Sequence, residues 1–369
     1  MKRLIYLITI LMMLSCTEKK AVRDSIISET RYASLLKMQS LDNGMTLCRI
    51  ANPWKADEAL AQYLLIQGTD SKIEGEELAK IESQYGRCTV VGTPLRRMAL
   101  TSSCHGYLLV QLGALDDVAV FCDAEYVEYA STKEKISNGQ IINGGSSLSP
   151  NIETLLSQQC DAMWISPFEN ATAGNIAALP LNIIHCADYM ENSPLGRAEW
   201  MRFYGRLVSK GTEADSLFNV VEVRYNAIKE KTQERDSITI FAELPYQATW
   251  YVPGGKSTMG IMYGDAGYRY VWADDDHPGS LALSAEIVLE KAQRADYWVV
   301  KYMAEEDYEL EDLLSQNDIY RQFKASQTGN VFGCNTNHSD FYDVMPFRPD
   351  SLLHELQNLG NGCYFKRLK

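Results

Sequence analysis

The sequence lacks the patterns that mark several common classes of protein. It has no run of five or more basic residues, and 48 Asp and Glu outnumber 35 Lys and Arg, which gives a formal net charge of −13. Because clustered basic side chains bind nucleic-acid phosphates, no nucleic-acid partner is expected. Walker A, GxGxxG, HExxH and CxxC patterns are also absent. This disfavours NTPases, dinucleotide enzymes, zinc proteases and thioredoxin-like proteins.

The composition that is present belongs to a globular protein. Apolar residues make up 46% of the 369 positions and charged residues 22%, which excludes collagen-like and mainly disordered chains. At roughly 100–200 residues per domain, this length favours two domains.

The first residues carry the features of an export signal. Lys2 and Arg3 precede an apolar run at 4–14, which is too short to span a membrane and ends at Ser15 and Cys16. A small residue before such a cysteine resembles a bacterial lipobox. We therefore expect residues 1–15 to be a signal peptide and Cys16 to become a lipidated N-terminus. The polar residues 16–33 then form a tether, and the protein lies in the periplasm, held to a bacterial membrane through lipid alone.

The other cysteines show no metal-binding pattern. They lie far apart, mostly in apolar stretches, at positions 48, 88, 104, 122, 160, 186, 334 and 363. Zinc sites need closely spaced pairs, so most of these thiols are predicted to be unpaired core residues. Export permits disulfides, so one or two stay possible.

Strand-like and helix-like segments alternate from 87 to 190 and again after 234, following strand-like segments at 34–66. Such alternation predicts βαβ units, and hence an α/β protein with mainly parallel sheets. We place an N-terminal α/β lobe at 34–211 and a C-terminal α/β lobe at 234–369.

Two helices are predicted near the boundary of the lobes, one at the end of the N-terminal lobe and one between the lobes. One covers 194–209 and begins near a proline. The other covers 212–233, about 33 Å at ~1.5 Å per residue. Its helical spacing is carried by Leu217, Val220, Val221, Arg224, Tyr225 and Ile228. Its length and central position suggest that it connects the lobes.

Four stretches, at 93–118, 146–166, 187–207 and 272–300, together resemble one known family. They are similar to the periplasmic substrate-binding proteins of ABC importers for ferric siderophores, haem and vitamin B12. The resemblance implies two lobes joined by a rigid helix, with the ligand held between them and small opening motions. It implies capture of a small metal chelate without chemistry, no intrinsic cofactor, and delivery to an ABC permease dimer with its ATPase subunits.

The same resemblance implies one exposed docking glutamate on each lobe, which pairs with permease arginines. Glu153 and Glu286 fit, since each follows a capping residue and precedes an apolar helix and an Asp-led strand. Asp161 lies eight residues after Glu153 and Asp296 ten after Glu286, so the second helix is expected to be longer or shifted. The alternative role of each glutamate is to favour the helix dipole without any partner.

Ligands of open α/β sheets lie beyond the carboxyl ends of the strands. The loops that meet this rule supply the candidate ligand-binding residues Ser102, Ser103, His105, Phe168, Trp250, Tyr251, Gly254, Gly255 and Ser257. Arg197 is a further candidate, because its charge could pair with an acidic ligand. Aromatic faces suit large flat or catecholate ligands, glycines permit close backbone approach, and a strand-to-helix turn holds anions. The alternatives are lobe core for Trp250 and Tyr251, helix capping for the Ser-Ser-His group, and a structural salt bridge for Arg197.

No metal ligand or catalytic residue is assigned. The five histidines lie far apart in sequence, although His105 and His338 form one hypothetical pair of haem-iron ligands across the cleft. No acid–base–nucleophile set is present, so the protein is not expected to be an enzyme. The leading interpretation is an importer's binding lipoprotein. The alternatives are a periplasmic chelatase or hydrolase on the same fold, and a stand-alone ligand scavenger.

Overall fold

The computed structural model describes residues 28–68, 73–169, 174–232 and 235–369. The predicted signal peptide, Cys16 and the first part of the tether lie outside the described residues. Within the described part of the chain, no helix combines the length and apolar character that crossing a membrane requires.

The described residues of the N-terminal half form two larger sheets and one pair of two-residue strands. The first has four strands in the order β1-β2-β3-β4, antiparallel except for the parallel pair β3–β4. Its bounds are β1 (Leu36–Ser40), β2 (Thr46–Ala51), β3 (Ala59–Gln67) and β4 (Thr89–Thr93), with α2 (Gly75–Tyr85) between the last two. The segment at 89–93, expected to start the alternating lobe, therefore completes this sheet instead, because α2 carries the chain back parallel to β3.

The second sheet of this half is wholly parallel, with the order β11-β10-β5-β6-β7. Its strands are β5 (Met98–Leu100), β6 (Val118–Phe121), β7 (Ile142–Asn143), β10 (Ala162–Ile165) and β11 (Asn182–His185). The helices of this part are α3 (Ser103–Gln111), α4 (Ala130–Ser137) and α5 (Ile152–Ser157), and β8 (Gly145–Ser146) pairs with β9 (Ser149–Pro150). Parallel pairing confirms the predicted βαβ organisation.

The predicted helix at 194–209 is two helices, α6 (Pro194–Glu199) and α7 (Met201–Leu207), which meet at Trp200. Ser193 caps α6 by accepting a hydrogen bond from the Gly196 N–H over 3.0 Å. The predicted connecting helix is confirmed as α8 (Gly211–Glu230), a 20-residue helix about 30 Å long. It ends three residues earlier than predicted.

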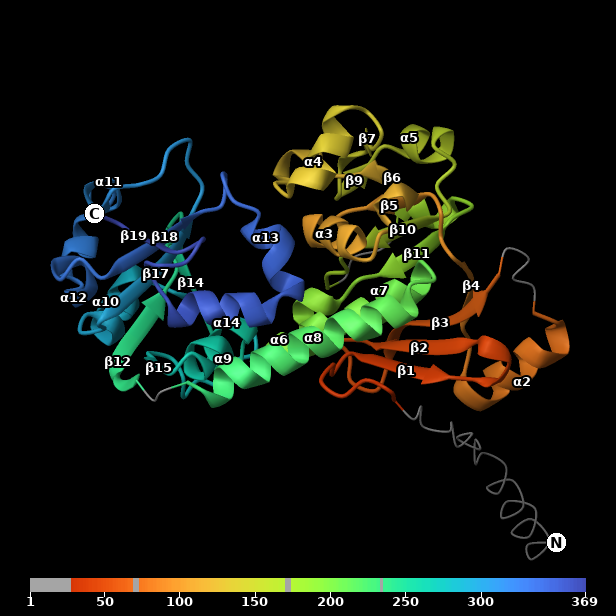
Figure 1. Cartoon of the computed structure of the whole chain (residues 1–369), viewed down its shortest axis with the longest axis horizontal. Helices are drawn as coiled ribbons and strands as arrows, with labels where there is room; N and C mark the ends of the chain where they lie inside the picture. Colours follow the sequence, from red (N-terminus) through yellow and green to blue (C-terminus); the bar gives the residue numbers. More distant parts are fainter. Residues whose placement is uncertain (1–27, 69–72, 170–173, 233–234) are drawn as a thin grey trace, which may run out of the picture.

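The buried face of α8 differs slightly from the predicted one. Ala214, Phe218, Val221 and Tyr225 are buried, whereas Val220 is 45% exposed. One end of α8 packs on α7 and the other on α14 (Pro349–Gln357), so it contacts both halves (Figure 1).

The C-terminal half contains its own five-stranded sheet, in the order β15-β12-β17-β18-β19, in which only β19 is antiparallel. The strands are β12 (Arg235–Ala242), β15 (Tyr268–Tyr270), β17 (Tyr297–Tyr302), β18 (Val331–Asn335) and β19 (Lys366–Arg367). A small antiparallel sheet of β13 (Pro245–Tyr246), β14 (Thr249–Pro253) and β16 (Ser280–Leu283) lies beside it. The helices are α9 (Thr258–Asp265), α10 (Ala285–Ala292), α11 (Leu310–Leu314), α12 (Lys324–Gln327), α13 (Phe341–Val344) and α14.

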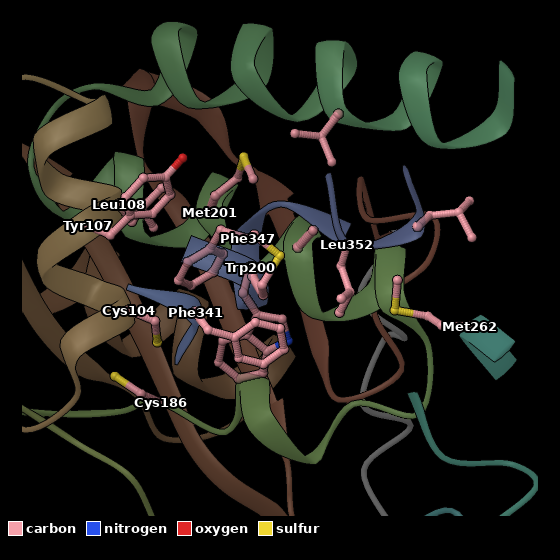
Figure 2. Close-up of a cluster of buried hydrophobic side chains, with 14 of the residues drawn as sticks. Cys104, Tyr107, Leu108, Cys186, Trp200, Met201, Met262, Phe341, Phe347 and Leu352 are labelled. Carbon is pink, nitrogen blue, oxygen red and sulfur yellow. The ribbon is translucent and has the colours of Figure 1, made fainter. Parts of the chain in front are cut away.

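The two halves share one hydrophobic core although their sheets are separate. Figure 2 shows side chains of α3 and α7 packed together with Phe341, Phe347 and Leu352 of the C-terminal segment. The Phe347 ring also lies 6.0 Å from the ring of Tyr204 in α7. A continuous core of this kind opposes large separations of the halves, because every exposed apolar side chain costs free energy.

The described cysteines agree with the prediction of unpaired thiols. All eight are free, and six of them are buried.

Candidate functional site

A small cavity lies where the two halves meet beside α8. It has a volume of about 150 Å³ and is lined by Pro194 and Arg197 of α6, by α9, by Lys301 of β17, and by Tyr342 of α13. Arg197 is therefore the predicted ligand residue that the structure places between the lobes. Ligand pockets usually measure about 300–1,000 Å³, so a haem-sized ligand would extend out of this cavity or part the lobes.

Both cations at this cavity have acidic partners. The Arg197 Nε donates to Asp188 over 3.3 Å, and Lys301 pairs with Glu243. Burial opposes the charge on Lys301, but Glu243 outweighs it and the pKa of Lys301 is raised. Because both cations are paired with carboxylates, the cavity carries little net charge. A ligand would therefore be bound mainly by apolar side chains and a few polar groups.

Asp188 is the centre of a buried polar network. It lies just beyond β11 and accepts hydrogen bonds from Tyr204 over 2.7 Å and from His105 Nε2 over 3.1 Å. Burial alone would raise the pKa of Asp188, but His105, Arg197 and Tyr204 together hold it below the usual value. The carboxylate thus stays charged and is fully engaged inside the protein.

His105 itself is only 1% exposed, and its ring packs at an angle against the rings of Trp164, Tyr204 and Phe347. The prediction that it contacts ligand is wrong for this conformation, because its ring faces Asp188 in the core. His338 lies exposed on the C-terminal half with its Nε2 2.6 Å from the Glu305 carbonyl oxygen. The hypothetical haem-ligating pair is therefore not formed.

One group of side chains has the composition of a metal site. The ligating atoms of Cys104, His105 and Asp188 lie within 4.8 Å of one another, and all three residues are buried. Asp188 is already occupied by three hydrogen-bond donors, and burial raises the pKa of the Cys104 thiol to about 12. A metal ion binds the thiolate form of cysteine, whereas this thiol is neutral and the neighbouring carboxylate already accepts hydrogen bonds. We therefore interpret the group as a hydrogen-bonded network and assign no metal to it.

Ser102 and Ser103 lie at the start of α3, where α13 packs against that helix. The Ser102 hydroxyl lies 3.2 Å from the Cys104 sulfur, and the Ser103 side chain lowers the pKa of Asp343 in α13. Both serines are half-buried, and their predicted role in holding a ligand stays a proposal.

Strand alternation separates the two predicted aromatic residues of β14. Trp250 is fully buried and donates from its indole nitrogen to the Ala242 carbonyl oxygen over 3.2 Å, so the prediction that it faces a ligand is wrong. It packs against Phe241, Trp298, Tyr320 and Phe323. Tyr251 points to the other face of the sheet and is 47% exposed, but it lines neither the 150 Å³ cavity nor the larger cavity at the carboxyl ends of β10 and β11.

The glycines after β14 serve the protein's own packing. A Cβ at Gly254 would lie 2.3 Å from the His277 carbonyl oxygen, and one at Gly255 would lie 2.4 Å from that of Asp275. The close approach is therefore to the loop at 272–279 and not to a ligand, which corrects the prediction. Ser257 is buried and caps α9 through the Gly260 N–H over 3.1 Å, so it too has a structural role.

The two predicted docking glutamates occupy equivalent positions. Glu153 is the second residue of α5 and Glu286 the second of α10, and both are exposed. Asn151 and Ser284 cap the two helices, and a hydrogen bond from Ser284 lowers the pKa of Glu286. Helix α5 has six residues and α10 has eight, which explains the two-residue offset seen in the sequence.

A larger cavity of about 580 Å³ lies at the carboxyl ends of β10 and β11. Phe168, a predicted ligand residue, lines it and is 54% exposed. The opposite wall comes from the turn between β2 and β3, which includes Trp54 and Lys55.

Sequence reasoning missed Asp188, Lys301, Tyr342 and Trp54. Asp188 lies three residues after the end of β11, and an acidic residue so close to the carboxyl end of an apolar strand was a signal that could have identified it. The other three are brought to their cavities by packing between distant segments, which leaves no local signal.

Comparison with known proteins agrees with this architecture. The sequence profile of the periplasmic binding protein family matches residues 99–337, well over half of the chain. An uncharacterized lipoprotein of Methanocaldococcus jannaschii is 25% identical over 342 residues, covering 87% of this chain and 79% of that protein.

Solved structures of the same kind are similar in fold. One is from the ABC-type Fe3+-hydroxamate transport system of Saccharomonospora viridis, with a TM-score of 0.55 and 19% identity over 73% of this chain and 96% of that one. Another is the periplasmic haem-binding protein of Vibrio cholerae, with a TM-score of 0.57 and 15% identity over 71% of this chain and 97% of that one. From the profile match and this shared two-lobed fold, the chain belongs to the periplasmic binding protein family.

Proposed function

We propose that this protein is the substrate-binding lipoprotein of an ABC importer, and that it captures a metal chelate and delivers it to a permease. The candidate ligands are a ferric siderophore, haem or cobalamin. The lipid on Cys16 holds the protein at a bacterial membrane, and Glu153 and Glu286 contact the permease.

The observation that carries this proposal is the 150 Å³ cavity, whose lining comes from both halves of the chain. Arg197 comes from the N-terminal half, whereas Lys301 and Tyr342 come from the C-terminal half. A ligand bound there contacts both lobes at once, and binding then favours one relative position of the lobes. Such coupling suits a carrier that signals its loaded state to a partner. The similar proteins of known ligand, a haem-binding protein among them, support the ligand class.

Binding of defined chelates tests the proposal. The mature protein is titrated with haemin, cyanocobalamin and a ferric hydroxamate by calorimetry, and one of them is expected to bind with one-to-one stoichiometry. Tyr342→Ala removes an aromatic ring that is 53% exposed at the cavity, and we expect it to weaken binding. Val223→Ala is the control, since this 67% exposed residue lies on α8 away from the cavity lining. No binding of any of the three chelates would contradict the proposal.

The enzymatic alternative is separated by the fate of the ligand. A binding protein returns the chelate unchanged after denaturation, whereas a chelatase or hydrolase yields product beyond one equivalent. The described residues near the cavity include carboxylates, but Asp188 and Glu243 are engaged in ion pairs with Arg197 and Lys301. We therefore expect the chelate to be recovered intact.

A further inference from the structure

We propose that the 580 Å³ cavity is a ligand subsite whose outer wall is the β2–β3 turn, and that it accepts a planar aromatic group of no net charge. This cavity shares no lining residue with the 150 Å³ cavity between the lobes, so the inference names a second binding element and rests on the proposed function for the class of ligand tested. The turn lies outside residues 99–337, the part matched by the family profile, so this wall is a feature of the chain's own N-terminal sheet.

The N-terminal sheet is fixed directly to the edge strand β11. The Tyr63 hydroxyl of β3 donates to the Ile183 carbonyl oxygen over 3.0 Å and accepts from the His185 N–H over 3.0 Å. Its ring stacks with Phe203 at a centroid distance of 5.9 Å. Since Tyr63 is 1% exposed, these contacts hold the sheet at a set position beside the carboxyl end of β11.

The turn itself is braced by one side chain. The Asn52 Oδ1 accepts hydrogen bonds from the backbone N–H groups of Trp54 over 2.9 Å and of Lys55 over 3.1 Å. The Asn52 N–H also donates to the Glu58 carbonyl oxygen over 2.9 Å, which closes the turn. A side chain that organises its own turn in this way leaves Trp54 in a defined position at the cavity.

The apolar lining of the cavity is unusually open to solvent. Phe168 is 54% exposed and Leu148 is 80% exposed, and Trp54 is half-buried beside them. Large apolar side chains exposed together at a concave surface are typical of binding sites. Their two aromatic rings favour a flat aromatic partner, which offers a large contact area without many rotatable bonds.

The polar lining defines the charge of the group that fits. Lys55 and Glu169 carry opposite charges, and burial lowers the pKa of His185, so this histidine is neutral at pH 7. The lining therefore has no net charge and offers mainly hydroxyl and amide groups, from Asn52, Ser147, Ser149, Ser166 and Asn175. An aromatic group with polar atoms at its edge can form hydrogen bonds with these hydroxyl and amide groups. An isolated charge finds no side chain of opposite charge that is left in excess.

Trp54 provides a specific reporter for this cavity. The chain has six tryptophans, and the other five are at most 3% exposed. Quenching of tryptophan fluorescence by acrylamide therefore monitors Trp54, and Trp54→Phe identifies its share. The probes are haemin, cyanocobalamin, a ferric hydroxamate and the uncharged aromatic dye N-phenyl-1-naphthylamine. Saturation with a probe that enters the cavity is expected to shield Trp54 from acrylamide.

Affinity measurements on three variants complete the test. Trp54→Ala and Phe168→Ala each remove a ring from the cavity wall and are expected to weaken binding about tenfold or more. Leu156→Ala is the control, because this residue of α5 is 49% exposed but does not line the cavity. Circular dichroism and thermal melting confirm that each variant is folded.

Each outcome decides the inference. Shielding of Trp54 together with weaker binding by both ring variants supports it. If a chelate binds while Trp54 stays accessible and both variants keep wild-type affinity, the inference is wrong and the proposed function stands. If no chelate binds but the dye shields Trp54 and the variants weaken its binding, the cavity is a ligand site and the importer proposal fails. If no probe shields Trp54, the inference is overturned.

Discussion

The Glu128 backbone N–H donates a hydrogen bond over 3.3 Å to Asp343, which connects the N-terminal half to helix α13 of the C-terminal segment. Asp343 is 2% exposed and lies close to the acidic side chains of Glu128 and Asp340. Burial raises the pKa of Asp343 to about 6, and the neighbouring carboxylates add to this, while Ser103 and the Glu128 amide act in the opposite direction. A buried carboxyl group with a raised pKa thus lies at the contact between the halves.

This pKa predicts a pH dependence of stability. Because the folded pKa of Asp343 exceeds its value in the unfolded chain, the carboxylate destabilises the fold above pH ~6, and this cost disappears below pH ~4. We expect Asp343→Asn to raise the free energy of unfolding at pH 7.5 by about 1–3 kcal/mol. The difference from wild type should shrink steadily between pH 7 and pH 4.5, as measured by urea unfolding. An equal difference at both ends of this range would contradict the assignment.

The crossing of α7 and α8 depends on a missing side chain. A Cβ at Gly205 would lie 2.3 Å from the Ala214 Cβ and 2.9 Å from the Lys210 carbonyl oxygen. We expect Gly205→Ala to force the helices apart and to lower the free energy of unfolding by about 1–3 kcal/mol. Denaturant midpoints measure the change.

The matched control is Gly264→Ala in α9, where nothing lies within 4 Å of the added methyl group. Alanine at an open helical position should instead stabilise the protein by about 0.5–1 kcal/mol. Similar effects of the two substitutions would show that helix propensity, and not the contact with α8, controls the result at Gly205.

The docking proposal for Glu153 and Glu286 separates delivery from capture. Both carboxylates are exposed at the first turn of a helix, so their removal should leave the fold and the ligand affinity unchanged. The double variant Glu153→Gln, Glu286→Gln is expected to lower chelate uptake, in membranes that contain the permease, by about tenfold or more, because charge pairs orient the partners.

The control is Glu290→Gln, another exposed carboxylate on α10. Uptake that stays at the wild-type level in the double variant would favour the stand-alone scavenger. Uptake lost equally in the control would point to net charge and not to the two predicted positions.

The sequence by itself determined the elements that depend on neighbouring residues. The helical spacing at 212–233 predicted α8, and apolar helices were predicted after Glu153 and Glu286, where α5 and α10 lie. The alternation of strands and helices predicted parallel sheets in both lobes. These predictions succeed because hydrogen bonds within a helix and apolar periodicity act over a few residues.

Only the tertiary structure decided which face of each strand is buried and which turns contact distant strands. Trp250 and Tyr251 are adjacent in sequence, yet the packing of β14 buries the first and exposes the second. Pairing with β3 places the strand at 89–93 in the N-terminal sheet. The contact of Tyr63 with β11 brings Trp54 to the same cavity as Phe168, although the two residues are more than a hundred positions apart in the sequence. Contacts between distant segments depend on the summed packing of the whole core, which no local pattern records.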